Sequence, residues 1–220
     1  MTPPRALVLG AGVFGLTSAL TLRRRGWDVD LVEPGPIPSP LASSTDRSKV
    51  IRADYGADET LSSLAQRAME IWRMWNRERF TRPLFHPVGF LLLRRSPMEP
   101  GSFEHESFTS LERRGMAVER IDSETLRRRF PAWNSQHYPD GYLSREAGWA
   151  ESGEVIRQLA RDALAGGVRH LQDRASSLLE RGGRVSGVRL ESGRHRESEV
   201  VVLATGAWTP SLLRRSEAFR

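Results

Sequence analysis

Residues 5–33 read RALVLGAGVFGLTSALTLRRRGWDVDLVE, and this stretch decides the fold. It opens with an apolar run over 5–9, which is typical of a parallel strand buried on both faces. Glycines then recur as GxGxxG over 10–15, an amphipathic stretch follows as far as Gly26, and the residues DVDLV over 28–32 come next. This order predicts a strand, a helix and a second parallel strand, which together form a βαβ unit.

Each of the three glycines in this fingerprint has a physical task. Gly10 permits the tight turn off the first strand, Gly12 lets a pyrophosphate approach the backbone, and Gly15 lets the helix pack closely on the sheet. A pyrophosphate would then lie at the positive end of the helix, held by main-chain amides such as those of Val13 and Phe14. A structural glycine turn without a ligand is the alternative interpretation.

An acidic residue, Glu33, ends the second predicted strand, 18 residues after Gly15. Its carboxylate would accept hydrogen bonds from the hydroxyls of an adenosine ribose. The same negative charge would repel a 2′-phosphate, so NADP is disfavoured. The sequence therefore predicts a dinucleotide site, and the βαβ unit by itself fits either NAD or FAD.

Composition and charge restrict the class of protein. The chain has 220 residues, of which 39% are hydrophobic, and this suffices for one large domain or a domain with a smaller second lobe. It contains no cysteine, which excludes a disulfide framework and a thiolate metal site, and we expect no metal. The net charge of +6 comes from short arginine runs scattered along the chain. We therefore expect solvated helix ends and no nucleic-acid partner.

The apolar residues near the start, over 6–22, are interrupted by three glycines and by hydroxyl side chains. They also lack a basic leader and a small-residue cleavage site, so they predict neither a signal peptide nor a membrane-spanning helix. We expect a cytoplasmic protein that makes no membrane contact.

The segment that follows the βαβ unit distinguishes between NAD and FAD. Prolines alternate over 34–40, and the chain then reads SSTDRSKVIRADYG over 43–56. An NAD-type domain would continue into another helix and strand. Here a hydroxyl-rich loop is followed by two cations, Lys49 and Arg52, and Lys49 is the single lysine of the chain.

With these motifs the sequence resembles the FAD-dependent amine and amino-acid oxidases of the D-amino-acid oxidase superfamily. The likeness is to the branch of monomeric sarcosine oxidase, N-methyltryptophan oxidase and the fructosyl-amino-acid oxidases. It rests on four matches in the family's order, which are the fingerprint 10–15 with Glu33, the segment 43–56, residues 141–143 with 148–150, and the run 200–208. These matches cover essentially the whole chain, but only the N-terminal part of the family's chain.

The resemblance implies roles for individual residues, and we expect Lys49 and Arg52 to be the catalytic ones. Lys49 matches a basic side chain beside the flavin ring, where a cation stabilises the charge that develops on reduction. Arg52 matches the arginine that pairs with the substrate carboxylate, to which a guanidinium offers a planar fork. Solvated loop cations are the alternative for both. The expected cofactor contacts are Gly10, Gly12, Val13, Phe14, Gly15, Glu33, Ser43, Ser44, Lys49, Ala175 and Gly206.

The expected fold class is α/β: a Rossmann-like FAD-binding domain with part of a second, mixed-sheet substrate lobe. Residues 1–83 and 148–220 are expected to be the two segments of the FAD-binding domain, and 84–147 part of the lobe. Short strand candidates over 168–190 predict an antiparallel meander before a last parallel strand at 200–204. The family has such a meander and NAD dehydrogenases lack it, which favours FAD.

Apolar residues recur at helical spacing over 59–80 and predict a long helix. Its buried stripe is expected to include Leu61, Leu64 and Trp72, with the tryptophan as a core residue and not a cofactor stacker. A further helix is predicted over 152–165, closed by a pair of glycines.

The resemblance implies that the protein oxidises the C–N bond of a secondary amine or amino acid. The flavin would be reduced, the imine product would hydrolyse, and oxygen or an electron carrier would reoxidise the flavin. None of the five histidines lies in a motif that marks it as a base. Two alternatives stay open: a truncated or split, non-catalytic member that needs a complementing polypeptide, and an NAD-linked Rossmann dehydrogenase. The sequence names neither the amine nor the electron acceptor.

Overall fold

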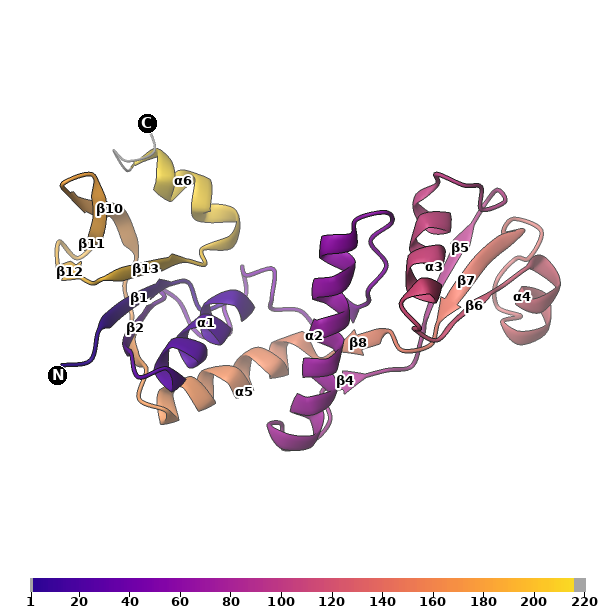
Figure 1. The fold of residues 1–220 in the computed structure, drawn as a ribbon. Coiled ribbons are helices and arrows are strands. Elements are labelled where there is room, and N and C mark those ends of the chain that lie inside the picture. Colours follow the sequence, from indigo (N-terminus) through magenta and orange to yellow (C-terminus); the bar gives the residue numbers. More distant parts are fainter. Residues whose placement is uncertain (1, 216–220) are drawn as a thin grey trace. The chain divides into compact units, whose positions relative to one another are not determined.

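The computed structural model describes residues 2–215 (Figure 1). The chain divides into two compact units, one built from Met1–Arg47 and Ser152–Arg220 and the other from Ser48–Glu151. Residues 1 and 216–220 of the expected domain segments lie outside the described part of the chain. The first unit is thus made from both ends of the sequence.

A four-stranded parallel sheet forms the centre of the first unit. Its order is β13 (Val200–Leu203), β1 (Arg5–Leu9), β2 (Asp28–Val32) and β9 (Arg169–Leu171). The helix α1 (Val13–Arg24) connects β1 to β2, so the predicted βαβ unit is confirmed. Residues 6–9 of β1 are buried, as expected for a strand that is covered on both faces.

Helices cover one face of this sheet. The helix α1 packs on β1, β2 and β13, and α5 (Ser152–Ala165) packs on α1 (Figure 1). The bounds of α5 agree with the predicted helix. Since side chains alternate along a strand, Ala6 and Val8 serve this face, and Leu7 and Leu9 serve the other.

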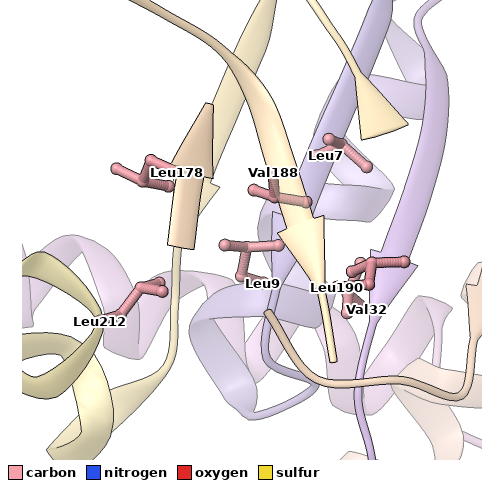
Figure 2. Close-up of a cluster of buried hydrophobic side chains, with 7 residues drawn as sticks. All are labelled: Leu7, Leu9, Val32, Leu178, Val188, Leu190 and Leu212. Carbon is pink, nitrogen blue, oxygen red and sulfur yellow. The ribbon is translucent and has the colours of Figure 1, made fainter. Parts of the chain in front are cut away.

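The other face carries the antiparallel meander β10 (Ala175–Arg181), β11 (Arg184–Leu190) and β12 (His195–Glu197). After β13 come a 3₁₀ turn, η1 (Gly206–Trp208), and α6 (Thr209–Arg214), which contacts β10. Figure 2 shows the shared core, which consists of Leu7, Leu9, Val32, Leu178, Val188, Leu190 and Leu212. The predicted meander and last parallel strand are confirmed.

The second unit contains two small antiparallel sheets. One has the order β3 (Lys49–Ile51), β8 (Gly148–Ala150), β4 (Phe85–His86), and the other β5 (Phe90–Arg94), β7 (Asp140–Ser144), β6 (Val118–Arg120). Its helices are α2 (Glu59–Glu78), α3 (Phe103–Arg113) and α4 (Ser123–Arg129). Each begins at a side chain that caps its first turn, namely Asp58, Ser102 or Asp122.

The buried face of α2 differs from the predicted stripe. Met69 is 1% exposed, whereas Leu61 and Leu64 are 45% and 63% exposed, so the prediction that these leucines are buried is wrong. Contacts of Trp72 with Phe85 set the rotation of the helix, with ring centroids 6.1 Å apart. Trp72 is half-buried against the buried ring of Phe85, and its assignment to the core stays a prediction.

Residues 48–83 and 148–151 lie within the second compact unit, although the sequence placed them with the FAD-binding domain. The physical reason for this grouping is that β3 pairs with β8 and α2 packs on β4. Their assignment to the FAD-binding domain stays a prediction.

None of the helices between residues 2 and 215 is long and apolar enough to span a membrane. Within the same residues, no group of three or more histidine, cysteine or acidic side chains has an arrangement suited to a metal ion.

Candidate functional site

The glycine turn joins β1 to α1 at the carboxyl end of the parallel sheet. Gly10 has a φ of +99°, and its amide donates a 2.8 Å hydrogen bond to the carbonyl of Val32. A Cβ on Gly10 would lie 2.4 Å from the carbonyl oxygen of Ala204, just after β13. Both the left-handed backbone and this close approach therefore require glycine at position 10.

The other two fingerprint glycines make room of different kinds. A Cβ on Gly15 would lie 1.8 Å from the carbonyl oxygen of Gly10, so Gly15 lets α1 start directly against the turn. A Cβ on Gly12 would lie 3.2 Å from Ser44 Oγ, and Ser44 is the only described residue within 4 Å of it. Gly15 thus allows α1 to pack against the glycine turn. Gly12 instead leaves space between the start of α1 and Ser44.

The first turn of α1 suits an anion. It contains no acidic side chain, and its N-cap residue, Gly12, has no side chain to cap it. The first amides of a helix have no acceptors within the helix and carry the positive end of its dipole. Ser44, from the loop after β2, brings its hydroxyl to this turn and accepts a 3.1 Å hydrogen bond from the amide of Val13.

Glu33 lies beside the same turn. Its Oε2 accepts a 3.0 Å hydrogen bond from the amide of Ala11, and its Oε1 accepts one of 3.3 Å from the amide of Gly35. The main chain of Glu33 extends the pairing of β2 with β9, because its amide donates a 3.1 Å hydrogen bond to the carbonyl of Leu171. The half-buried carboxylate is therefore oriented by two main-chain donors at the carboxyl end of β2.

The other residues expected to contact the cofactor are Phe14, Ser43, Ala175 and Gly206, and they differ in exposure and in backbone position. Phe14, in the first turn of α1, is 78% exposed, and Ser43 is exposed beside Ser44. Ala175 opens β10 opposite Leu190, and Gly206 begins η1 with a φ of +54°. Close approaches and hydrogen bonds connect Gly10, Gly12, Val13, Gly15, Ser44 and Glu33, the last through Ala11.

A groove of about 420 Å³ lies elsewhere in the first unit, at the amino ends of β1, β2 and β9. Arg169 in this groove is paired with Asp28 at 2.8 Å and with Asp30 at 2.7 Å. Since these charges offset one another and the groove lies at the opposite end of the strands, it does not belong to the candidate dinucleotide site.

The two expected catalytic residues belong to the second unit. Lys49 is exposed in β3, opposite Ala150 of β8. Arg52 follows β3, and its guanidinium carbon lies 5.5 Å from the ring centroid of Tyr55 and 5.5 Å from that of Phe90. Two aromatic rings thus contact the guanidinium, an arrangement that limits its rotation.

A buried acid lies two residues after Arg52. Arg52 donates a hydrogen bond to the carbonyl of Asp54, whose side chain is completely buried. The hydroxyl of Tyr142, in β7, donates a 2.6 Å hydrogen bond to Asp54 Oδ1. Burial raises the pKa of the Asp54 carboxyl, and the hydrogen bond from Tyr142 and the charge of Arg52 act in the opposite direction.

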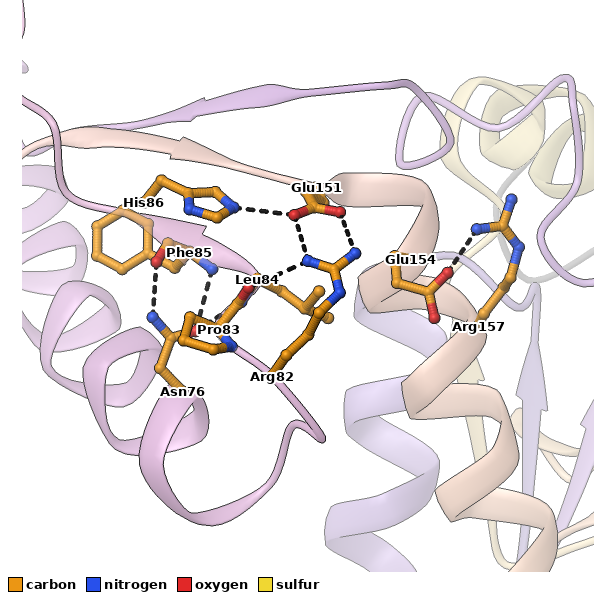
Figure 3. A network of polar contacts seen from close by, with 9 residues as sticks. All are labelled: Asn76, Arg82, Pro83, Leu84, Phe85, His86, Glu151, Glu154 and Arg157. Atoms are coloured by element: carbon orange, nitrogen blue, oxygen red, sulfur yellow. Dashed lines mark hydrogen bonds and ion pairs between the residues drawn. The ribbon is translucent and has the colours of Figure 1, made fainter.

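A polar network connects α2, β4 and the end of β8 (Figure 3). Glu151 accepts two 2.6 Å hydrogen bonds from Arg82 and lies 2.9 Å from His86 Nε2. Arg82, and to a smaller extent His86, lower the pKa of Glu151 to about 2. The His86 ring in turn stacks on Trp149 with centroids 4.3 Å apart, so the network holds β4 against β8.

Comparison with known proteins decides the family. The profile of the FAD-dependent oxidoreductase family (DAO) matches residues 5–219. The chain belongs to this family. The βαβ unit was the only feature that also fitted an NAD-linked dehydrogenase. Because the FAD-dependent profile covers this unit together with the rest of residues 5–219, the unit no longer supports the NAD alternative.

Proteins similar to this family member include an amino acid oxidase and a sarcosine oxidase. The amino acid oxidase imqH of Aspergillus flavus is 28% identical, over 96% of this chain and 53% of that protein. The peroxisomal sarcosine oxidase of Homo sapiens is 26% identical, over 95% of this chain and 52% of that protein. The solved structure of fructosyl amine:oxygen oxidoreductase (Amadoriase I) from Aspergillus fumigatus has a TM-score of 0.78 and 26% identity, over 96% of this chain and 51% of that one.

These comparisons confirm the resemblance inferred from the motifs. The chain spans about half the length of the relatives that it matches. The sequence reasoning missed two features of the candidate site, namely the bond between Ala11 and Glu33 and the buried pair of Asp54 and Tyr142. Neither has a local signal, because the partners lie 22 and 88 residues apart in the chain.

Proposed function

We propose that the chain binds FAD at the glycine turn and that the protein oxidises the C–N bond of a secondary amine or amino acid. The family match supports a flavin enzyme. The names of the relatives, which include amino acid oxidases, a sarcosine oxidase and a fructosyl amine oxidoreductase, support the substrate class.

The residues of the first unit fit the polar parts of FAD. Gly12 and the first amides of α1, including that of Phe14, would hold the pyrophosphate, and Glu33 would accept hydrogen bonds from the ribose. The main chain at Ala175 would contact the adenine, and the turn at Gly206 would pass close to the cofactor. Ser43 and Ser44 would contribute hydroxyl groups. Bound FAD supplies the acceptor for the electrons and hydrogen that the substrate loses.

The second unit would contribute the two cations. Arg52 would pair with the carboxylate of an amino-acid substrate through its planar guanidinium, and Lys49 would place a positive charge beside the flavin ring. The contact of Arg52 with Tyr55 and Phe90 supports this role, because a guanidinium with restricted rotation loses less entropy when it binds.

The observation that carries the proposal is the hydrogen bond from the amide of Ala11 to the carboxylate of Glu33. In a purely structural glycine turn there is no need for a carboxylate at the end of the next strand, whereas a dinucleotide needs both parts at one edge of the sheet. Replacing Glu33→Gln is expected to weaken FAD binding roughly tenfold, because the acceptor loses its charge. The matched control is Glu78→Gln, at an exposed position near the end of α2.

The test is the visible absorption spectrum of the purified protein before and after adding FAD, and then an N-alkyl amino acid such as sarcosine without oxygen. Flavin bands that appear and bleach with the amine are the expected result. If FAD is not taken up, the proposal fails, and a non-catalytic member or one that needs a complementing polypeptide takes its place. Reoxidation by oxygen or by an electron carrier, and a cytoplasmic location, are further parts of the proposal that rest on the sequence.

A further inference from the structure

A carboxyl group and a tyrosine hydroxyl are paired inside the second unit. Asp54 and Tyr142 are both 0% exposed, and the Tyr142 hydroxyl donates to Asp54 Oδ1 at 2.6 Å. The second oxygen, Asp54 Oδ2, is also buried and has no hydrogen-bond partner among the described residues. Buried apolar side chains around Tyr142 include Met69, Met98 and Leu111, and the buried Ser107 also lies beside its hydroxyl.

Burying such a pair in a core has an unfavourable free energy of desolvation. A buried carboxyl with one unpaired oxygen costs free energy of desolvation, and apolar side chains of the same volume would usually stabilise the fold more. Burial also raises the pKa of the Tyr142 hydroxyl, which therefore keeps its proton and remains the donor. A buried polar pair of this kind calls for a purpose other than stability.

The pair fixes the segment that carries Arg52. The Arg52 guanidinium donates to the main-chain carbonyl of Asp54, the same residue whose side chain Tyr142 holds. Two residues later, the amide of Gly56 donates to Ser107 Oγ at 2.8 Å. The segment is thus attached to β7 and α3 on either side of Tyr55, whose ring lies against Arg52.

Tyr142 is a rigid point of attachment. It lies in β7, the middle strand of its sheet, opposite Leu92 of β5 and Arg120 of β6. The main chain of a central strand is held on both sides by the hydrogen bonds of the ladder, so the point from which the Tyr142 side chain extends changes little when neighbouring loops move.

We propose that Asp54 and Tyr142 are positioning residues, and that their hydrogen bond fixes the carbonyl that orients the Arg52 guanidinium for a substrate carboxylate. This inference rests on the proposed function of Arg52. In this arrangement the hydrogen bond, and not the charge of Asp54, does the positioning, because Arg52 contacts the main chain of Asp54 and Tyr142 contacts its side chain.

The first test measures how strongly the protein prefers a carboxylate. The ratio of the dissociation constants of sarcosine methyl ester and sarcosine is obtained without oxygen, from the way the rate of flavin bleaching in the FAD-saturated protein depends on the concentration of each compound. Asp54→Ala and Tyr142→Phe are each expected to lower this ratio roughly tenfold, and the double variant by the same factor, since both remove one hydrogen bond. Asp54→Asn retains an acceptor and is expected to stay within about twofold of the wild type.

Controls separate positioning from a general loss of stability. Asn76→Ala removes hydrogen bonds to the backbone of Leu84 and Phe85 in the same unit and should leave the ratio unchanged. Additive effects of Asp54→Ala and Tyr142→Phe, an Asn variant as impaired as the Ala variant, or an equal loss in Asn76→Ala would each overturn the inference.

A second test needs neither substrate nor flavin turnover. The Nε–H signal of Arg52 in a ¹H–¹⁵N spectrum is identified by its loss in Arg52→Lys. It should be sharp in the wild type and in Asp54→Asn, and broadened by exchange with water in Tyr142→Phe; an unchanged signal in Tyr142→Phe contradicts the inference. If Arg52→Ala leaves the carboxylate preference intact, the proposed function of Arg52 fails, and this spectrum still decides whether the pair positions it.

Discussion

The carboxylate of Glu33 accepts a hydrogen bond from the amide of Ala11 at 3.0 Å, so the acid that ends β2 is attached to the glycine turn that follows β1. Two motifs separated by a whole helix therefore act at one edge of the sheet. This arrangement brings a group suited to ribose hydroxyls next to amides suited to a pyrophosphate.

Two glycines of the turn should respond differently to the same substitution. Gly15→Ala places a Cβ 1.8 Å from the carbonyl of Gly10, and we expect it to destabilise the protein by at least about 3 kcal/mol. Gly12→Ala meets only Ser44 Oγ, at 3.2 Å, from an extended backbone. It should change stability by less than about 1 kcal/mol and weaken FAD binding at least roughly tenfold. Urea unfolding and FAD titration measure the two effects; equal losses of stability would contradict this account.

Arg52→Ala should remove affinity for the substrate and leave the flavin in place. The loss of a charge-assisted pair with a carboxylate corresponds to an increase of KM by roughly ten- to a hundredfold. Arg52→Lys keeps the charge but not the planar fork, so it should recover part of the affinity. Steady-state kinetics and the flavin content of the purified variants measure both. Turnover of an amino acid at an unchanged KM in Arg52→Ala would show that the carboxylate binds elsewhere.

The pH dependence of stability should include a contribution from Glu151. Its pKa in the folded protein is lowered to about 2 by Arg82 and His86. A lowered pKa stabilises the fold above the unfolded value of about 4.5, and the effect disappears as the pH falls from there towards about 2. Because Arg82 is 55% exposed, we expect only about 1 kcal/mol at neutral pH. Glu151→Gln should lose that amount near pH 7 and equal the wild type near pH 2, as followed by urea unfolding; a constant difference would argue against this ion pair.

The rotation of α2 can be tested by two truncations of apolar side chains. Met69 is 1% exposed, and Met69→Ala should destabilise the protein by about 2–5 kcal/mol. Leu64 is 63% exposed, and Leu64→Ala should change stability by less than about 0.5 kcal/mol. The free energy of unfolding in urea measures both changes. The reverse order would favour the stripe predicted from the sequence.

The fold of the first unit was largely predictable because its signals are local. The apolar run of β1, the glycines that follow it, the valines and leucine of β2 and the period of α5 each limit the backbone over a few residues. The rotation of α2 was not predictable in this way. Leucines and alanines at neighbouring positions allow two stripes, and the contact of Trp72 with the distant Phe85 decides between them.

The candidate site was predictable only in part. Gly10, Gly12 and Glu33 follow from the spacing of the fingerprint, and Arg52 was reached through a family resemblance. Asp54 lies next to these motifs, yet its burial depends on Tyr142, and only the folded chain brings that hydroxyl to it. A polar residue in a polar loop carries no sign that it will become part of a core.

The interrupted path of the first unit also sets an order of assembly during synthesis. The strand β1 needs β13 as a neighbour, and their register pairs Ala6 with Val200. The pairing of β1 with β13 therefore cannot form until residues 200–203 have left the ribosome, and the glycine turn lacks its contact with Ala204 until then. The second unit is continuous in sequence and can fold first. A chain interrupted during translation would accordingly contain a folded second unit and an unfinished parallel sheet.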